Sequence, residues 1–143
     1  AQGRVAMAEW ISGSRIRDAV EPRGVIPLMR DALMTHSRGE SVTPMPMHLD
    51  LPPAAEVHIK CGYRPGGNYF VLKAAGSFAS GTNGAMLLFS AASGDLVAVL
   101  QDNGYLTDLR TAAASAMTTR ELGRTDRTLG ILGTGVQARL TAL

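Results

Sequence analysis

The apolar positions of the first forty residues recur at the spacing of helices. Ser14 is a suitable N-cap for a first helix over Arg15 to Val20. Ile26, Met29, Leu33 and Met34 then repeat at intervals of three and four residues, which predicts a second helix over about Val25 to Ser37. The N-terminal part of the chain is therefore predicted to be helical.

From Ser41 onward the pattern changes to short apolar runs that are separated by turn residues. The runs, each predicted to be a strand, are Val42 to Leu49, Glu56 to Tyr63, Tyr69 to Ala74, Ala85 to Ser90 and Leu96 to Gln101. The breakers between them are Pro52-Pro53, Arg64 to Asn68, Gly76 to Gly84 and Ser93-Gly94-Asp95. The last breaker resembles a hairpin turn, so these strands are predicted to pair largely antiparallel and not as a Rossmann sheet.

After Gly104 the sequence predicts a helix and then the start of a different unit. The helix is expected over about Thr107 to Leu122, with an alanine-rich middle that would allow another backbone to approach closely. A polar link follows, and then an apolar strand is expected at Thr128 to Leu132. This predicts an α+β domain over residues 1–124, with N-terminal helices and a mixed, largely antiparallel sheet, and the truncated start of a Rossmann domain over residues 125–143.

Composition and charge exclude several classes of protein. The chain has 143 residues, of which 45% are hydrophobic and 18% are charged, and no apolar run approaches the ~20 residues that cross a bilayer. We expect a cytoplasmic protein without a membrane partner. The net charge is only +2 and the arginines are scattered, so no nucleic-acid partner is expected. The single cysteine, Cys61, is expected to be a half-buried strand residue, and no metal site is expected because it has no ligand spacing with the three histidines.

A glycine-rich turn carries the first chemical signal. The expected strand runs into Gly133-Thr134-Gly135-Val136-Gln137-Ala138, a Gly-x-Gly-x-x-Ala motif that opens dinucleotide-binding units. The first glycine permits the turn, the second lets the backbone approach a pyrophosphate, and the helix N-terminus faces the phosphates. Such turns also occur without any nucleotide, so the motif by itself leaves both interpretations open.

Two cations stand at positions where a cation is unexpected. Arg110 falls in the first turn of its predicted helix, where it opposes the helix dipole, so either an acidic ligand or a neighbour such as Asp102 or Asp108 should offset it. Lys73 lies in the apolar run Tyr69 to Ala74, where alternation could place it on the solvated face or in a binding site. Both residues are therefore candidates for an anion site.

The motifs taken together resemble the ornithine cyclodeaminase and mu-crystallin family. The resemblance rests on Leu106-Thr107-Asp108-Leu109-Arg110-Thr111-Ala112-Ala113, followed about two dozen residues later by the glycine motif. It covers nearly the whole chain but less than half of a family member, and Asp102 to Asp108 looks closest to the ectoine-utilisation branch. The resemblance implies a substrate-binding and dimerisation domain followed by a Rossmann domain, and hence a homodimer.

The same resemblance implies roles for individual residues. Arg110 matches an arginine that contacts both substrate carboxylate and cofactor, and Lys73 matches a lysine at the substrate. The implied cofactor is NAD or NADP, held by Arg110 and by the loop residues Gly133, Thr134, Gly135, Val136 and Gln137. The proton-carrying aspartate of the family would lie beyond Leu143, so no catalytic residue is expected within the chain.

Two positions depart from the family's cyclodeaminases. His48 stands in the region of a second substrate-binding arginine and is a candidate replacement for it, although a structural or solvated histidine is the alternative. Met86 stands where cyclodeaminases have a cofactor-contacting threonine, and a thioether cannot donate the same hydrogen bond. Both departures argue against ornithine itself as the substrate.

The resemblance implies a small amino acid that is oxidised to an imine, cyclises with loss of ammonia and is reduced again. The alternatives are an NAD(P)H-dependent reductase of a cyclic imine such as a pyrroline- or piperideine-2-carboxylate, and a mu-crystallin-like protein that binds ligand without turnover. A further alternative is a dimerisation half-domain that has no activity by itself.

Overall fold

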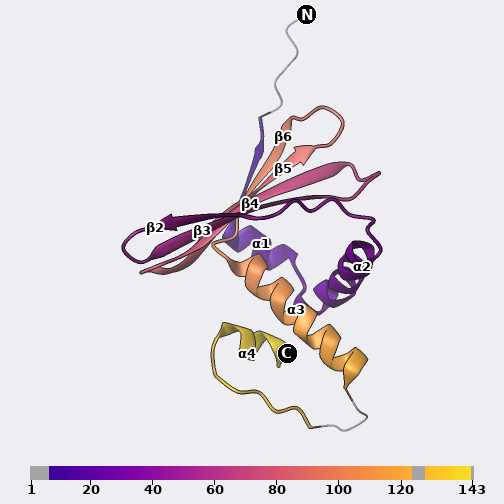
Figure 1. Cartoon of the computed structure of the whole chain (residues 1–143), viewed down its shortest axis with the longest axis vertical. Helices are drawn as coiled ribbons and strands as arrows, with labels where there is room; N and C mark the ends of the chain where they lie inside the picture. The colour runs from indigo at the N-terminus through magenta and orange to yellow at the C-terminus, as the bar shows by residue number, and fades with distance from the viewer. Residues whose placement is uncertain (1–6, 124–127, 143) are drawn as a thin grey trace, which may run out of the picture.

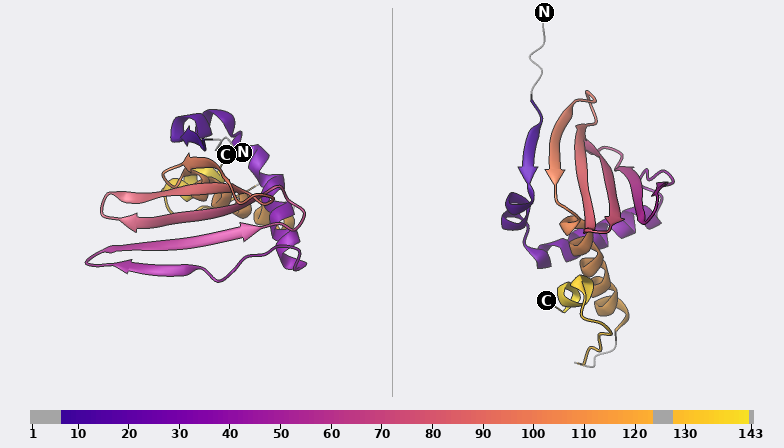
Figure 2. Two further views of the ribbon diagram at one scale, coloured as in Figure 1. Left: turned by 90° about the horizontal axis from the view of Figure 1, so that it is seen from above. Right: turned by 90° about the vertical axis from the view of Figure 1, so that its left-hand side faces the viewer.

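A computed structural model describes residues 7–123 and 128–142 as a sheet with helices on one side (Figures 1 and 2). The elements are β1 (Glu9–Ser12), α1 (Gly13–Ala19), the 3-10 helix η1 (Pro22–Gly24), α2 (Val25–Ser37), β2 (Met47–Leu51), β3 (Ala55–Tyr63), β4 (Tyr69–Phe78), β5 (Gly81–Ser90), β6 (Leu96–Gln101), α3 (Tyr105–Leu122) and α4 (Val136–Thr141). The predicted α+β class is confirmed.

The sheet has six strands in the order β1-β6-β5-β4-β3-β2. Its four hairpin-connected pairs are antiparallel, as predicted, and β1 is added at the edge parallel to β6. The prediction that the N-terminal part is helical is therefore wrong for Glu9–Ser12. A four-residue strand that pairs with a strand about ninety positions later leaves no local signal.

The first helix begins slightly earlier than its sequence indicated. Ser12 is the N-cap of α1 and its hydroxyl accepts a hydrogen bond from the Arg15 amide, so the prediction that Ser14 caps this helix is wrong. The second helix, α2, has the predicted bounds. It packs on α3, where Arg30 Nε lies 3.0 Å from Glu121 Oε1.

One predicted breaker turned out to be strand. Residues 76–84 were expected to be a loop, but β4 continues to Phe78 and β5 begins at Gly81. Glycine was misleading here because Gly76 and Gly84 lie where neighbouring strands approach too closely for a side chain. A Cβ on Gly76 would overlap the Glu56 carbonyl oxygen of β3, and one on Gly84 would lie 2.6 Å from the Ala75 Cβ.

The two faces of the sheet have different surroundings. The register Lys60↔Lys73↔Met86↔Leu100↔Ile11 places these side chains on one face, which we call the helix face because α1 and the start of α3 approach it. The other face, which we call the open face, carries Trp10, and that side chain is 59% exposed. The buried apolar residues are Ile16, Ala98, Leu109, Ala112 and Ala113.

The alanine-rich helix α3 connects the sheet to the C-terminal segment. Ala112 and Ala113 are only 2% and 4% exposed, as expected for a stretch against which other elements pack closely. At its N-terminal end, the guanidinium of Arg17 on α1 lies 5.0 Å from the ring centre of Tyr105. α4 packs along the same helix farther on (Figure 1).

The segment that follows α3 differs from its prediction. Thr128 to Leu132 form no strand, and Leu132 is fully exposed. A parallel strand is stable only between partner strands, and the described residues offer none beside this segment. The predicted domain boundary at residue 124 and the polar link Arg124 to Arg127 fall at or within residues 124–127, outside the described part of the chain.

Candidate functional site

Lys73 lies in the middle of β4 and reaches toward the first turn of α3. Its Nζ donates a 2.8 Å hydrogen bond to Oγ1 of Thr107, and the side chain is half-buried. The solvated-face alternative for Lys73 therefore does not describe this structure. Thr107 was not identified as a partner from the sequence, because the contact joins residues 34 positions apart.

The surroundings of Lys73 are positively charged. Burial lowers the pKa of the Lys73 ammonium below its usual value, the Arg110 and Lys60 charges lower it further, and Asp102 alone acts in the opposite direction. Lys60 stands directly opposite Lys73 across β3 and β4. Like charges that face each other across a sheet are destabilising, so an anionic ligand at this point would stabilise the arrangement.

Arg110 is exposed on α3 and has no hydrogen bond or ion pair within residues 7–123 and 128–142. Neither of the two carboxylates considered as its partner contacts it. Asp102 accepts a 2.9 Å hydrogen bond from the Leu106 amide, and Asp108 accepts a 2.8 Å bond from Gln137 Nε2. The expectation that Arg110 lies in the first turn is wrong, because α3 begins at Tyr105 and its first turn ends before residue 110.

A tight turn fixes the end of α3 that faces Lys73. Asn103 and Gly104 both have positive φ, 49° and 87°, and Asp102 is only 2% exposed. The Asp102 carboxylate caps the helix by accepting from Leu106. The sequence Asp-Asn-Gly thus turns the chain sharply out of β6 and brings Thr107 into contact with Lys73 on the helix face, with Arg110 close enough for its charge to lower the pKa of Lys73.

The glycine motif forms an exposed loop that leads into α4. Gly133 has a φ of 105°, which favours glycine, and a Cβ on Gly135 would meet no atom within 4 Å, so the backbone there is open to a ligand. Thr134 is exposed, and Gln137 anchors the helix to Asp108 of α3. The Gln137 side-chain oxygen is buried and has no hydrogen-bond partner among the described residues. These features fit a loop that approaches a phosphate, although without the strand that was expected to precede it.

His48 is not brought to Lys73. It lies on β2, opposite His58 of β3, and its Nε2 is 2.9 Å from Asp50 Oδ1. β3 lies between the strand of His48 and the strand of Lys73, and the two residues are also two positions apart along the strand direction. Met86, by contrast, stands directly opposite Lys73 on β5.

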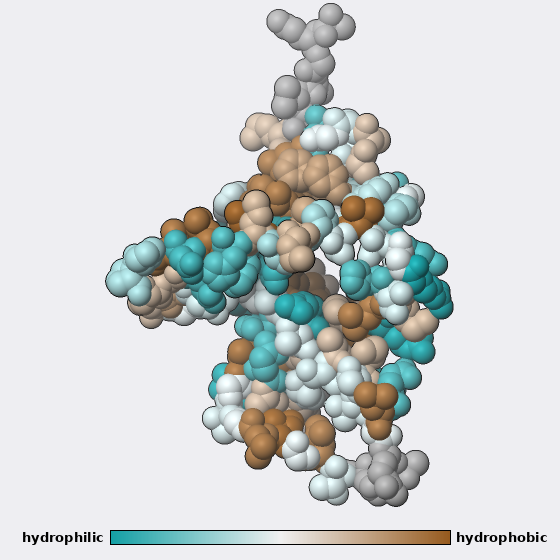
Figure 3. Space-filling model, in the orientation of Figure 1, coloured by the Kyte–Doolittle hydropathy of each residue, from teal (hydrophilic) through white to brown (hydrophobic). Residues whose placement is uncertain are grey.

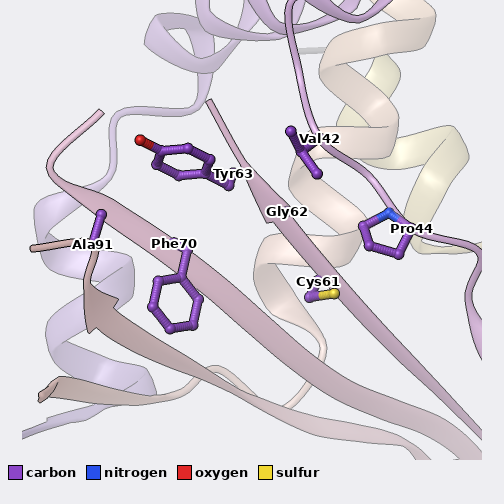
Figure 4. Close-up of a pocket in the computed structure, with 7 residues that line it drawn as sticks. All are labelled: Val42, Pro44, Cys61, Gly62, Tyr63, Phe70 and Ala91. Atoms are coloured by element: carbon purple, nitrogen blue, oxygen red, sulfur yellow. The ribbon is translucent and has the colours of Figure 1, made fainter. Parts of the chain in front are cut away.

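The described chain also has an apolar hollow that lies away from these charges. Its volume is about 420 Å³, and it is lined by Val42, Pro44, Cys61, Gly62, Tyr63, Phe70 and Ala91 (Figure 4). Cys61 is exposed there, so the expectation of a half-buried residue is wrong. No lining residue is charged, so this hollow is poorly suited to a carboxylate, and we place the candidate site at Lys73 and Arg110 on the basis of charge and geometry.

The arrangement predicts a specific effect of pH on stability. Because the folded state holds Lys73 at a lowered pKa, it releases this proton at a lower pH than the unfolded chain does, and stability should rise with pH between the two pKa values. Raising the pH from about 8 to about 10 should therefore stabilise the chain relative to its Lys73→Met variant. Urea denaturation of both proteins at the two pH values measures the difference.

The control for this measurement is Arg120→Met, which removes an exposed cation from α3. A stability difference between the chain and Lys73→Met that does not change with pH would contradict the environment described for Lys73.

Comparison with known proteins identifies relatives over most of the chain. A model of the ornithine cyclodeaminase/mu-crystallin family matches residues 73–143. The chain is 38% identical, over 88% of its length, to a Rhizobium meliloti (strain 1021) protein that is named as a candidate dehydrogenase. It is 36% identical, over 84% of its length, to an uncharacterized cyclodeaminase of Sinorhizobium fredii (strain NBRC 101917 / NGR234). It spans only 43% and 41% of these two relatives.

Solved structures share the fold. The chain superposes on a probable ornithine cyclodeaminase of Bordetella pertussis Tohama I with a TM-score of 0.83 and 26% identity, over 95% of this chain and 43% of that one. An archaeal alanine dehydrogenase dimer with bound NAD gives a TM-score of 0.86 at 20% identity, over 94% and 43%. The pyrroline-2-carboxylate reductase of Thermococcus litoralis, in complex with NADH and L-proline, gives 0.85 at 22% identity, over 94% and 44%.

Proposed function

The chain belongs to the ornithine cyclodeaminase/mu-crystallin family, and we propose that it supplies the substrate-binding part of an NAD(P)-dependent cyclodeaminase that acts on a small amino acid through an imine. The observation that carries the proposal is the pair of Lys73 and Arg110. The Lys73 ammonium is hydrogen-bonded to Thr107 of α3 in a cationic environment. The Arg110 guanidinium, on α3, has no partner within the described part of the chain.

In this proposal the two cations hold the substrate carboxylate. Arg110 offers two N–H groups in one plane, which suits a carboxylate, and Lys73 adds a second donor from the sheet. Thr107 keeps the Lys73 ammonium directed at α3, so that both donors act from fixed elements. A carboxylate bound in this way has its α-carbon in a defined position, which is the chief contribution that a protein makes to a reaction of a bound cofactor.

The glycine loop is the part of the chain that would hold NAD or NADP. Gly133, Thr134 and Gly135 would present backbone N–H groups to the pyrophosphate, and Val136 and Gln137 would line it at the start of α4. When bound, the nicotinamide accepts and returns a hydride. Gln137 links this loop to Asp108, two residues before Arg110, so the proposed cofactor and carboxylate positions are joined through α3.

The open face of the sheet is proposed as the surface on which two copies of the chain associate. Apolar side chains gather over the end of the sheet that contains β1, β5 and β6 (Figure 3). Trp10 of β1, which the register places on this face at that end, is 59% exposed, and Met47 of β2, at the opposite edge of the same face, is 61% exposed. Large exposed apolar patches commonly mark protein interfaces. Sedimentation velocity of the chain should report a dimer, and a monomer at micromolar concentrations would contradict this surface assignment.

No helix among the described residues has the length and apolar character that a membrane crossing requires. The proposed cytoplasmic location fits the dependence on NAD(P), and fractionation of cells that express the protein would test it.

The experiment that tests the proposed activity uses a full-length polypeptide that carries this chain. It is incubated with NAD⁺ and with ornithine, lysine or 2,4-diaminobutyrate in turn, and ammonia release is followed together with absorbance of NADH. A cyclodeaminase releases ammonia without net change in cofactor. Absence of ammonia release with every diamino acid would overturn the proposed reaction.

A second candidate is a cyclic-imine reductase, and Met86 favours it. Met86 faces Lys73 across β4 and β5 and cannot donate the hydrogen bond that the threonine of cyclodeaminases provides. His48 also does not reach the Lys73 site. Stoichiometric consumption of NADH or NADPH on addition of pyrroline-2-carboxylate, without ammonia release, would establish the reductase instead.

A further inference from the structure

Two histidines and a glutamate meet on the helix face of the β2–β3 hairpin. His48 and His58 are directly paired across the strands, and their ring centres lie 4.7 Å apart at an angle of 88°. Glu56 precedes His58 by two positions on β3, so its side chain is on the same face. One carboxylate oxygen of Glu56 lies 3.7 Å from Nε2 of His58, and the other lies 3.7 Å from Nε2 of His48.

The spacing between Glu56 and the two histidines fits a metal ion better than it fits hydrogen bonds. A separation of 3.7 Å is too long for a hydrogen bond. Ligand atoms at ~2.0–2.2 Å from a tetrahedral Zn²⁺ ion lie roughly 3.3–3.6 Å from one another. One ligating atom from each of the three residues lies within 4.8 Å of the other two, so rotation of the side chains is enough to close the site.

The chemistry of the set indicates which ion it would take. Two imidazoles and one carboxylate are ligands of Zn²⁺ and related first-row ions, whereas Mg²⁺ and Ca²⁺ prefer oxygen alone. The side chains are 45% exposed for His48, 46% for Glu56 and 39% for His58, so an ion can reach them from solvent. In the structure Nε2 of His48 forms a 2.9 Å hydrogen bond with Oδ1 of Asp50, so an ion bound at this nitrogen would replace that contact.

We propose that His48, Glu56 and His58 form a binding site for a divalent first-row metal ion, with Zn²⁺ the best match, on the β2–β3 hairpin. The site shares no residue with the candidate site at Lys73, although His58 stands two positions from Lys60 on the same face of β3, and it does not depend on the proposed reaction. It was invisible in the sequence because its ligands are not grouped in a zinc-binding spacing, and only the register of β2 and β3 brings His48 opposite His58. Cys61 points to the other face of β3 and is not part of it.

The test is calorimetric titration of the 143-residue chain with zinc chloride at about pH 7.5. One ion per chain should bind with a dissociation constant in the micromolar range or below. Glu56→Gln and His58→Gln should each weaken binding at least about tenfold, because even residues outside the first coordination shell commonly change metal affinity by that factor. Both substitutions retain a polar side chain on an exposed surface, and circular dichroism of each variant checks that the fold is unchanged.

The matched control is His36→Gln. His36 is the remaining histidine of the chain, lies on α2 and contacts Ser41 and Thr43, so its substitution should leave zinc affinity unchanged. Titration with Co²⁺ adds an independent readout, because tetrahedral coordination gives visible absorption bands that the two ligand variants should lose. The proposal is overturned if no heat of binding is seen up to millimolar zinc, or if His36→Gln weakens binding as much as His58→Gln does.

Discussion

Replacing Arg110 with methionine should lower kcat/KM of the full-length enzyme for its amino-acid or imine substrate by at least about a hundredfold. That factor corresponds to about 2.7 kcal/mol of lost transition-state stabilisation, which is within the range for a charge-assisted hydrogen bond to a bound carboxylate. Methionine keeps the unbranched, helix-forming character of the position, so α3 should be preserved. Steady-state kinetics over a range of substrate concentrations, with cofactor saturating, measures the effect.

The matched control is Arg120→Met, which removes an exposed arginine from the last turn of the same helix. It should leave kcat/KM within about a factor of two, since exposed charges away from a site contribute little. If Arg110→Met and Arg120→Met reduce kcat/KM equally, Arg110 has no specific role in binding the substrate. Circular dichroism of both variants shows whether a loss comes from the helix and not from the lost contact.

The second large effect is expected on stability, from Gly76→Ala. Gly76 pairs with Val57 on β3, and an added Cβ would overlap the Glu56 carbonyl oxygen while lying 3.0 Å from Val57 Cγ2. The obstacle is backbone, which cannot move without breaking the β3–β4 ladder. We expect a loss of about 3 kcal/mol or more, comparable with the larger effects of overpacking, or failure to fold. Urea denaturation followed by circular dichroism measures the free energy of unfolding.

Gly130→Ala is the control for this substitution. No atom lies within 4 Å of a Cβ at Gly130, and the residue is exposed. The free energy of unfolding of Gly130→Ala should stay within about 0.5 kcal/mol of that of the parent chain, as is usual for surface positions. A Gly76→Ala variant as stable as Gly130→Ala would show that the strands can separate at this point and that the close approach of β3 and β4 is not required.

The candidate site could be found only in part from the sequence. Lys73 stood out because a cation in an apolar strand needs an explanation. Arg110 stood out because the sequence placed it in the first turn of its helix, a placement that the structure contradicts. That the two residues lie near one another could not be predicted from the residues around either of them. Thr107 and Lys60, which complete the surroundings of Lys73, became visible only when α3 and β3 were placed against β4.

His48 shows the opposite case. The sequence offered it as a replacement for a substrate-binding arginine, and the structure places it with His58 and Glu56, away from Lys73. His48 is kept from Lys73 because β3 lies between β2 and β4, and which strand lies between two others depends on the order of strands in the sheet. Residue type and position along the chain contain no information about that order.

The sequence by itself determined the α+β class, the bounds of α2, the cores of β3, β4, β5 and β6, and the family, because each depends on residues that lie within a few positions of one another or on a contiguous motif. The strand predicted over Val42 to Leu49 begins only at Met47 in the structure. Tertiary structure alone decided that Glu9–Ser12 is a strand, that residues 76–84 continue the sheet, and that Thr128 to Leu132 do not form a strand. In each of these cases the backbone conformation depends on whether a partner strand is present at hydrogen-bonding distance. That is a property of segments remote in the chain, and short-range propensities cannot report it.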